Sequence, residues 1–278
     1  MNLIIQAVQA IAPNHLDHIA KLSQSTHTEQ VSDTVYRLAN ANPHAQIAPY
    51  CLEHQLDFGF VPAGRSLSDF GMLVMDMDST LISIECIDEI ADMQGLKLQV
   101  AAITESAMRG EIDFAESLRR RVALLAGLEE QALLRVYDER LKLNPGAEFM
   151  LSKLQALGIK TLLVSGGFMF FTERLKARLG LDYTYANNLE IIDGKLTGKV
   201  LGDVFDAQSK ADCLTSISQE MNLSTDQVIS MGDGANDLKM MAVAGVSIAY
   251  HAKPVVREQA SYALNFVGLD GLVNLLAG

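Results

Sequence analysis

The sequence has few cysteines and few basic residues for its length, and each shortage excludes a class of protein. Cys51, Cys86 and Cys213 are far apart, odd in number and without CxxC spacing, which predicts reduced side chains rather than a disulfide framework or a zinc site. Lys and Arg total 22 against 34 Asp and Glu, giving a net charge of −12. Nucleic acid is therefore not expected as a partner, because neutralising its phosphates requires clustered cations. An anionic small molecule needs only local positive groups inside a cleft, and it remains a suitable ligand.

Long apolar runs are missing as well. Residues 1–12 are apolar, but they contain no Lys or Arg and run into Pro13. This stretch is too short to span a bilayer and lacks the basic end of a signal peptide. No later stretch reaches membrane-spanning length without charges, so we predict a cytoplasmic protein with no membrane partner. Its 49% hydrophobic and 20% charged residues are typical of a globular protein whose core needs no disulfides.

Three regions differ in their pattern of residues. Residues 1–68 mix short apolar segments with helix-like polar stretches, and the composition of residues 62–69 is typical of a linker. Residues 84–143 favour helix throughout, since apolar residues recur every three or four positions and no proline occurs before Pro145. Five histidines lie in the first region, at spacings that indicate no metal site: His15, His18, His27, His44 and His54.

From residue 144 onward, predicted strands and helices alternate, which implies a largely parallel sheet. Asp193-Gly194 predicts the turn of a hairpin within this region. We therefore expect an α/β fold in which a mostly parallel sheet carries an inserted helical subdomain. A small α+β domain precedes it, giving domains at residues 1–68 and 69–278.

Two carboxylates, Asp76 and Asp78, stand two positions apart at the end of a short apolar strand, Leu73–Met75. In an extended chain such residues point the same way, so both side chains are expected to face one pocket at the strand edge where open α/β sheets bind ligands. Carboxylates this close repel each other unless a cation lies between them or one keeps its proton. Either arrangement serves catalysis. The alternative is an ordinary exit from a strand into a loop, where Asp and Ser are also favoured.

Two other predicted strands also end in polar residues. Residues 160–164 are followed by Ser165-Gly166-Gly167, a sequence that lets backbone N–H groups approach a phosphate but that is also common in turns. Residues 228–231 precede the loop Gly-Asp-Gly-Ala-Asn-Asp at 232–237, whose oxygen ligands suit a hard cation. Asp237 is equally placed to cap the next helix. The loop lacks the closing Glu of a calcium-binding loop and follows a strand, so calcium is not expected.

Lys210 begins a helix predicted over residues 210–221. A cation at a helix N-terminus opposes the helix dipole, which argues for a role other than helix stability. A solvated surface lysine is the alternative.

These motifs occur in a fixed order: Asp76-Met77-Asp78-Ser79-Thr80, Ser165, Lys210 and the loop at 232–237. In that order they resemble the four signature motifs of the haloacid dehalogenase superfamily of phosphatases, over about residues 71–278. Residues 76–92 and 110–125 are further similar to the members of that superfamily that act on phosphoserine. The resemblance implies a Rossmann-like, mostly parallel core with a helical cap at about residues 84–143. In relatives, an extension such as residues 1–68 is sometimes a regulatory domain.

The implied reaction is Mg²⁺-dependent hydrolysis of O-phospho-L-serine, the final step of serine biosynthesis. By resemblance, Asp76 is the nucleophile that forms an aspartyl-phosphate, and Asp78 is the general acid and then the general base. Mg²⁺ is implied to bind Asp76, the Asp78 backbone carbonyl and Asp233. The remaining phosphate-binding and supporting residues implied by the motifs are Ser165, the Gly166 amide, Lys210, Asn236, Asp237 and Thr80.

Substrate selection is implied to come from the cap. Glu85 is expected to bind the ammonium group of phosphoserine and Arg121 its carboxylate, since an Arg fork suits a carboxylate. Without the resemblance, the alternative is a helix-surface ion pair between them. Met108 and Phe114 are expected to supply apolar walls, and the cap to close as a lid that excludes water.

Two other functions stay open at this point. One is a phosphatase or phosphotransferase acting on another small phosphomonoester, such as phosphohomoserine. The other is a non-enzymatic receiver protein phosphorylated on aspartate, against which Asp78, Thr80 and the long insert argue. Apolar segments near the start of the chain are compatible with a homodimer.

Overall fold

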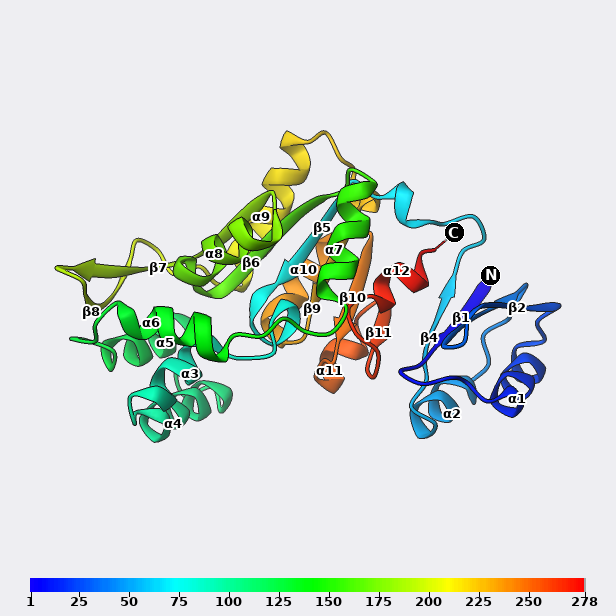
Figure 1. Ribbon diagram of the computed structural model, residues 1–278, viewed down its shortest axis with the longest axis horizontal. Coiled ribbons are helices and arrows are strands. Elements are labelled where there is room, and N and C mark those ends of the chain that lie inside the picture. Colours follow the sequence, from blue (N-terminus) through cyan, green and yellow to red (C-terminus); the bar gives the residue numbers. More distant parts are fainter. Residues whose placement is uncertain (278) are drawn as a thin grey trace.

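The computed structural model of the protein describes residues 1–277 and contains two sheets (Figure 1). The smaller has the strand order β2-β3-β1-β4 and the larger the order β11-β10-β9-β5-β6-β7-β8. The predicted second domain ended at residue 278, and that last residue lies outside the described ones. Within residues 1–277, no helix combines the length and the apolar character that crossing a membrane requires.

The N-terminal region is an antiparallel sheet with two helices on one face. Its elements are β1 (Asn2–Gln6), α1 (Pro13–Ser23), β2 (His27–Ser32), β3 (Val35–Ala39), α2 (Ile47–Glu53) and β4 (Asp57–Val61). Alternate residues of a strand face opposite sides: Leu3 and Ile5 pack with the helices of this region, while Ile4 packs into the main core of the protein. The central strand β1 is therefore buried on both faces, whereas every residue of the edge strand β2 is exposed.

The large sheet is parallel except at one edge. Its strands are β5 (Met72–Asp76), β6 (Lys160–Phe168), β7 (Tyr183–Ile192), β8 (Lys195–Leu201), β9 (Val228–Gly232), β10 (Val246–Tyr250) and β11 (Tyr262–Leu264). The antiparallel pair is β7 and β8. Asp193 and Gly194 join these two strands and both have positive φ, as a two-residue hairpin turn requires. The predicted fold class is confirmed.

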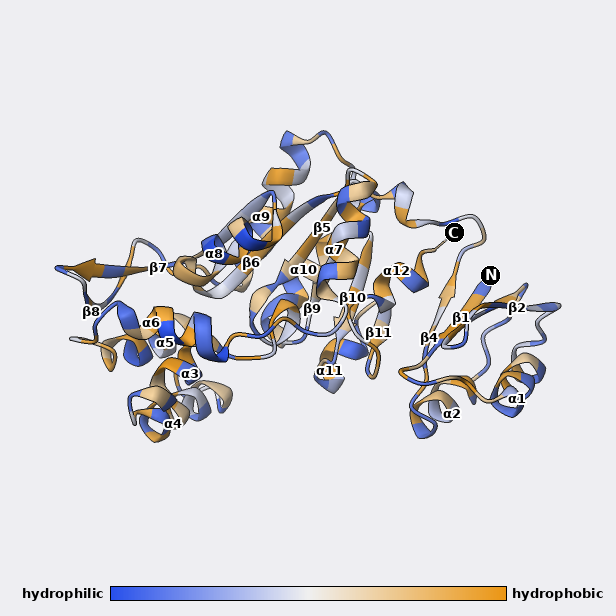
Figure 2. Cartoon of the chain, in the orientation of Figure 1, coloured by the Kyte–Doolittle hydropathy of each residue, from blue (hydrophilic) through white to orange (hydrophobic). Residues whose placement is uncertain are grey.

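Helices cover both faces of this sheet. They are α7 (Ala147–Ala156), α8 (Met169–Leu179), α9 (Ala207–Glu220), α10 (Leu238–Val243), α11 (Pro254–Arg257) and α12 (Gly271–Leu275). Leu73 packs with apolar residues of α7 and α8, whereas its neighbour Val74 packs with α9 and α10. Figure 2 shows hydrophilic and hydrophobic residues on these helices, as expected where one side of a helix faces a core.

The predicted helical insert is present between β5 and β6. It consists of α3 (Cys86–Met93), α4 (Lys97–Met108), α5 (Phe114–Ala123) and α6 (Gln131–Arg135). The β7–β8 hairpin lies against this cap in Figure 1. Main-chain hydrogen bonds from Gly127 to Leu196 and from Leu196 to Leu128, both 2.8 Å, join them. The cap thus shares backbone contacts with the end of the large sheet, which the sequence pattern did not predict.

Strands β5 and β9 differ from their predicted bounds by one residue at an end, whereas β6 and α9 extend three or four residues further than predicted. Strand β6 continues to Phe168, with a shift in register between Val164 and Phe168, because the Ser-Gly-Gly segment stays extended instead of turning. Helix α9 begins at Ala207, since the carboxylate of Asp206 accepts hydrogen bonds from the N–H groups of Gln208 and Ser209. The domain boundary at residues 68 and 69 stays a prediction; a 3₁₀ helix, Leu67–Asp69, lies there.

Candidate active site

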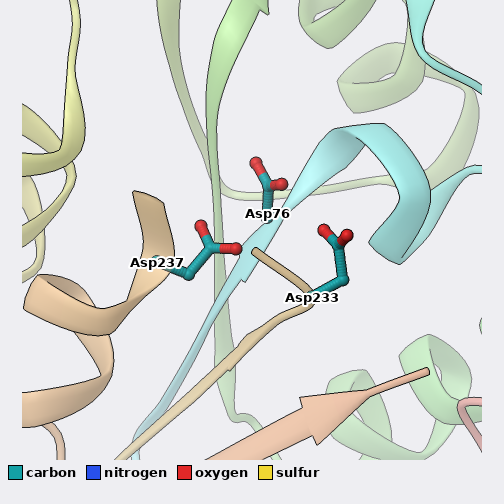
Figure 3. A group of neighbouring side chains, drawn as sticks. All are labelled: Asp76, Asp233 and Asp237. Atoms are coloured by element: carbon teal, nitrogen blue, oxygen red, sulfur yellow. The ribbon is translucent and has the colours of Figure 1, made fainter. Parts of the chain in front are cut away.

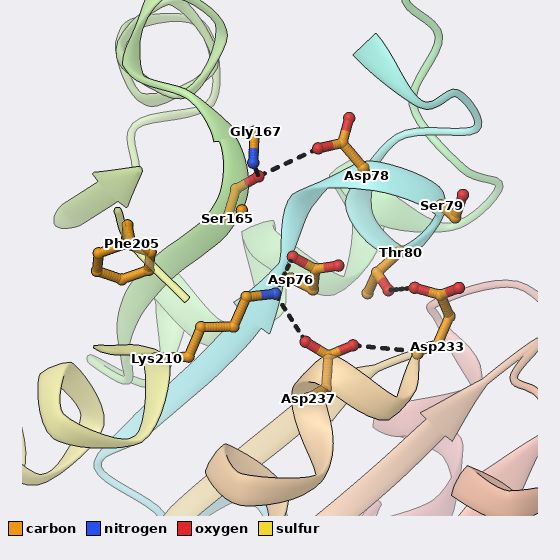
Figure 4. A network of polar contacts seen from close by, with 12 residues as sticks. Asp76, Asp78, Ser79, Thr80, Ser165, Gly167, Phe205, Lys210, Asp233 and Asp237 are labelled. Carbon is orange, nitrogen blue, oxygen red and sulfur yellow. Dashed lines mark hydrogen bonds and ion pairs between the residues drawn. The ribbon is translucent and has the colours of Figure 1, made fainter. Parts of the chain in front are cut away.

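The polar residues predicted from the motifs meet at the carboxyl ends of three neighbouring strands. Strand β5 lies between β6 and β9. Asp76 is the last residue of β5, Ser165 lies three residues before the end of β6, and Asp233 directly follows β9. The chain passes from β5 to β6 on one side and returns to β9 on the other, so this edge is the position where the strand order reverses. Open α/β sheets bind ligands at such a position. Figure 4 shows the side chains pointing toward one another there.

Lys210 is buried between two carboxylates. Its Nζ lies 2.6 Å from Asp76 Oδ1 and 2.7 Å from Asp237 Oδ1, and the lysine is 1% exposed. Burial opposes its charge, but Asp76 and Asp237 outweigh burial and raise the pKa of Lys210. The surface-lysine alternative is therefore wrong for this residue. Burial and the nearby Asp237 raise the pKa of Asp76, and Lys210 counteracts part of that increase.

Asp78 is held apart from this ion pair by other donors. Its Oδ1 accepts a hydrogen bond from the N–H of Cys86 at 2.9 Å, and its Oδ2 accepts one from the Ser165 hydroxyl at 3.1 Å. Burial raises the pKa of Asp78, and the hydrogen bonds from Cys86 and Ser165 oppose that increase. A Cβ atom on Gly167 would lie 2.7 Å from Asp78 Oδ2, so a side chain at that position would displace the Asp78 carboxylate.

The turn that carries Asp78 is held by Asn144, a residue that belongs to none of the sequence motifs. The chain turns over Met77–Leu81, with Ser79 at a φ of 58°. The side-chain amide of Asn144 donates to the carbonyl oxygens of Thr80 at 2.8 Å and Ile82 at 3.1 Å. Because Ser79 adopts a left-handed conformation that costs energy outside glycine, we infer that Asn144 helps to hold the turn in place.

Three carboxylates form a group that fits a divalent cation. Asp76, Asp233 and Asp237 each offer an oxygen, and these oxygens all lie within 4.8 Å of one another (Figure 3). Burial and the nearby Asp237 raise the pKa of Asp233 to about 6. Oxygen donors with excess negative charge are what Mg²⁺ prefers. The side chain of Asp78 is not in this group. Asp78 could therefore bind the metal only through its backbone carbonyl.

Asp237 caps the short 3₁₀ helix Ala235–Asp237 and not α10, the helix that was predicted to follow it. It stands just before α10, but its side chain makes no capping bond to that helix. Its Oδ2 accepts instead from the N–H of Gly234 at 3.1 Å, while Oδ1 binds Lys210. Thr80 also supports the site, since its hydroxyl donates to Asp233 Oδ1 at 3.4 Å. Asn236 lies on the same loop and lines the adjacent cavity.

A cavity of about 490 Å³ separates these residues from the cap. The core side of its lining includes Asp76, Asp78, Gly166, Asp233, Asn236 and Lys253, and the cap side includes Glu85, Asp88, Met108, Phe114, Ser117 and Arg121. The Phe114 ring lies over Gly166, where a Cβ atom would be 3.0 Å from it. The predicted apolar residues Met108 and Phe114 therefore lie on the cavity wall, as the sequence reasoning expected.

Glu85 and Arg121 both line this cavity. The ion pairs found within residues 1–277 do not include one between these two side chains. The hydroxyl of Ser79 donates to Glu85 Oε1 at 2.8 Å, and burial and the nearby Asp78 raise the pKa of Glu85 to about 7. Burial lowers the pKa of Arg121, with Asp88 and Glu85 opposing that change. An Arg side chain stays charged after such a change, so the cap presents one cation beside two carboxylates.

Two further residues of the site, Asn187 and Lys253, lie outside the sequence motifs. Asn187, 2% exposed, donates to the carbonyl of Gly166 at 2.9 Å and accepts from the N–H of Phe205 at 2.7 Å. It thereby ties the end of β6 to the segment before α9. Its sequence signal is weak, because β7 contains a second asparagine and other polar residues. Lys253 lies on the core side of the cavity, and only its place shortly after β10 could have indicated it.

Comparisons with known proteins agree with this geometry. The profile of the haloacid dehalogenase-like hydrolase family matches residues 71–245, and a domain of unknown function, DUF4072, matches residues 3–47. The phosphoserine phosphatase of a Polaromonas species is 55% identical over 215 residues, covering 76% of this chain and 91% of that protein.

Two solved structures are also similar to the chain. The crystal structure of a probable phosphoserine phosphatase from Vibrio cholerae, in unliganded form, aligns with a TM-score of 0.88 and 39% identity, covering 99% of this chain and 86% of that one. A structure described as a phospho-aspartyl intermediate analogue of phosphoserine phosphatase aligns with a TM-score of 0.69 and 37% identity. The alignment covers 74% of this chain and 99% of that one.

Replacing Lys210 by Met should destabilise the protein, because it leaves Asp76 and Asp237 buried without their cation. Removing one partner of a buried ion pair costs about 3–5 kcal/mol, which urea unfolding near neutral pH in metal-free buffer would measure. Lys160→Met is the matched control, since Lys160 pairs with Asp182 at the surface and should lose no more than ~1 kcal/mol. Equal, small losses in both variants would contradict the account of Lys210.

The raised pKa of Glu85 predicts a pH-dependent stability. Its pKa rises from 4.5 to about 7 on folding, so the folded state holds the proton more tightly and loses stability as pH rises through that window. Glu85→Gln cannot ionise. The melting temperature of this variant minus that of wild type should therefore increase as the pH is raised from about 5 to about 8 in metal-free buffer. The same difference at both pH values would show that Glu85 titrates normally.

Proposed function

The chain belongs to the haloacid dehalogenase-like hydrolase family, and we propose that it hydrolyses O-phospho-L-serine to L-serine and phosphate with the help of Mg²⁺. The observation that carries the proposal is the arrangement of the cavity. Asp76 and Asp78 line its core side, while Arg121 and Glu85 line its cap side. One side is suited to a phosphate ester and the other to an amino acid. The relative that is 55% identical is a phosphoserine phosphatase, which supports this choice.

Asp76 is assigned as the nucleophile. Lys210 binds its Oδ1, which leaves Oδ2 for the attack on phosphorus. A bond forms between this oxygen and phosphorus as the bond to the serine oxygen breaks, and the product is an aspartyl-phosphate. The departing serine oxygen needs a proton. Burial raises the pKa of Asp78, so this carboxyl group is suited to carry that proton at the start of the reaction.

The second half of the reaction uses the same groups in reverse. Asp78, now ionised, takes a proton from a water molecule as the water attacks phosphorus. The bond between phosphorus and Asp76 breaks, which releases phosphate and restores the carboxylate. Lys210, the Ser165 hydroxyl and the Gly166 amide are assigned to the negative charge on the phosphoryl oxygens, the type of stabilisation that dominates phosphoryl transfer. In the structure the Ser165 hydroxyl donates to Asp78, so it must turn toward the phosphate when substrate binds.

The residues that would hold Mg²⁺ are Asp76, Asp233 and the backbone carbonyl of Asp78, with Asp237 close to them. When bound, the ion shields the carboxylates from the phosphate dianion and polarises a phosphoryl oxygen. Asp237 holds Lys210, and Thr80 holds Asp233, so both keep a liganding or phosphate-binding group in position. Asn236 is assigned to the phosphate side of the cavity.

Substrate selection is assigned to the cap. The Arg121 guanidinium would bind the serine carboxylate through two parallel hydrogen bonds. Glu85 would bind the ammonium group, whose positive charge favours the ionised form of this carboxyl and counteracts its raised pKa. Phe114 and Met108 close the wall between the two polar ends. Closure of the cap would exclude water while the aspartyl-phosphate forms.

The same proposal places the reaction in the cytoplasm, as the last step in making serine. The chain's cysteines are all free, and two of them are buried, which suits a reducing compartment.

Phosphate release from L-phosphoserine, phosphohomoserine, phosphothreonine and p-nitrophenyl phosphate tests this function, first with Mg²⁺ and then with EDTA. We expect activity that EDTA abolishes and that favours phosphoserine. Arg121→Ala should raise KM for phosphoserine roughly 10- to 100-fold, because a hydrogen bond to a charged group contributes about 1.5–3 kcal/mol. KM for p-nitrophenyl phosphate, which has no carboxylate, should change little.

Arg121→Lys is the matched variant, since it keeps the charge and loses the fork, and it should fall between wild type and Arg121→Ala. Equal losses on phosphoserine and p-nitrophenyl phosphate would remove the carboxylate role. Mg²⁺-dependent activity that favours phosphohomoserine instead would keep the reaction but change the substrate.

A further inference from the structure

One buried carboxylate of the N-terminal sheet binds a loop of the phosphatase region. Asp57, the first residue of β4, is 1% exposed. Its Oδ1 accepts from the main-chain N–H of Asn265 at 2.7 Å, and its Oδ2 accepts from those of Phe266 at 2.9 Å and Val267 at 3.0 Å. The side-chain amide of Asn265 adds a fourth hydrogen bond at 3.2 Å. The carboxylate thus holds three consecutive residues by their backbone.

The loop at 265–267 in turn holds His251, just after β10. The His251 N–H donates to the carbonyl of Leu264 at 2.7 Å, and Nε2 lies 2.9 Å from the carbonyl of Val267. Because a carbonyl only accepts, Nε2 must carry the hydrogen. His251 has a φ of 43°, and such a conformation persists only where the surroundings hold it.

The segment that follows His251 reaches the candidate metal site. Two residues on, the N–H of Lys253 donates to the carbonyl of Asp233 at 3.2 Å, and both residues line the active-site cavity. The backbone that carries Asp233 is therefore hydrogen-bonded to a segment whose conformation depends on the loop that Asp57 holds.

The chain two residues beyond this loop is hydrogen-bonded to the segment that supports the turn carrying Asp78. The N–H of Leu269 donates to the carbonyl of Pro145 at 2.8 Å. Asn144, the residue before Pro145, donates hydrogen bonds to carbonyls of the turn that carries Asp78. A second cleft, of about 500 Å³, lies where these segments meet, and Val8, Ser79, Asn144, Asp233, His251 and Lys253 are among its lining residues. Because Val8 and Asp233 line the same cleft, the N-terminal region borders the cleft that contains Asp233.

We propose that Asp57 is a positioning residue for the active site. By fixing the backbone at 265–267, it sets the positions of both the Asp233 loop and the turn over Met77–Leu81. The N-terminal region is then part of the catalytic framework of this chain, in addition to any other role. The proposal rests on the proposed function only where Mg²⁺ binding is used to test it.

The test compares Asp57→Asn with wild type in the full chain. The substitution keeps the volume but turns one acceptor into a donor that faces backbone N–H groups, so at least one hydrogen bond of the clamp is lost. Hydrogen exchange read by mass spectrometry should become faster in peptides that contain Lys253 and Val267. Calorimetric titration with Mg²⁺ should show roughly 2- to 30-fold weaker binding, the range expected for residues that act through others.

Two further variants make the test specific. Tyr262→Phe removes a different hydrogen bond between the same two regions, from Tyr262 Oη to the carbonyl of Phe60 at 3.3 Å, and it should match wild type in both measurements. His251→Asn keeps a residue that tolerates positive φ but shortens the side chain that reaches Val267. It should reproduce the effects of Asp57→Asn, and it decides the question if Asp57→Asn does not fold.

The proposal is overturned if Asp57→Asn lowers the melting temperature while exchange at Lys253 and Mg²⁺ affinity stay at wild-type values. Asp57 would then only join two regions. It is equally overturned if Tyr262→Phe produces the same changes, since any weakening of the interface would suffice. Failure of wild type to bind Mg²⁺ would count against the proposed function alone, and the exchange measurement would still decide the role of Asp57.

Discussion

The interaction on which the site depends is the burial of Lys210 between Asp76 and Asp237. Three carboxylates, those of Asp76, Asp233 and Asp237, meet within one small volume, and the lysine ammonium compensates only part of their charge. Buried charge without compensation is costly, so these groups favour either extra protons or a bound cation. The raised pKa values of Asp76 and Asp233 and the proposed need for Mg²⁺ therefore have the same cause. The fold creates this situation by ending β5 and β9 side by side and placing the first turn of α9 behind them.

The motifs could be predicted because each is a local pattern. Asp76 follows an apolar strand, the 232–237 loop follows another, and the helical insert shows its own periodicity. What could not be predicted depends on contacts between distant parts of the chain. Asn144 supports a turn more than sixty residues earlier, and Asn187 links two segments that no periodicity relates. The burial of Lys210 is of the same kind, since its position in the helix predicts neither of its partners. The hairpin turn at Asp193-Gly194 was predictable, but its contact with the cap was not.

The N-terminal sheet shows the same limit in another form. Its strands alternate, so a pattern with a period of two indicates that Leu3 and Ile5 face one way and Ile4 the other. The pattern does not say that the second face is covered by the phosphatase region. Nor does a single Asp at the start of β4 indicate that it receives four hydrogen bonds from a loop two hundred residues away. These contacts join the small sheet firmly to the region that carries the site.

The central claim is that Asp76 forms a covalent bond to phosphorus, and trapping that species tests it most directly. The enzyme would be mixed with phosphoserine and Mg²⁺, quenched in acid within a single turnover, digested and analysed by mass spectrometry. The account predicts one added phosphoryl group on the peptide that contains Asp76, lost on treatment with base and absent from Asp76→Asn. Turnover of phosphoserine at a normal rate by Asp76→Asn, or a phosphoryl group on another residue, would contradict it.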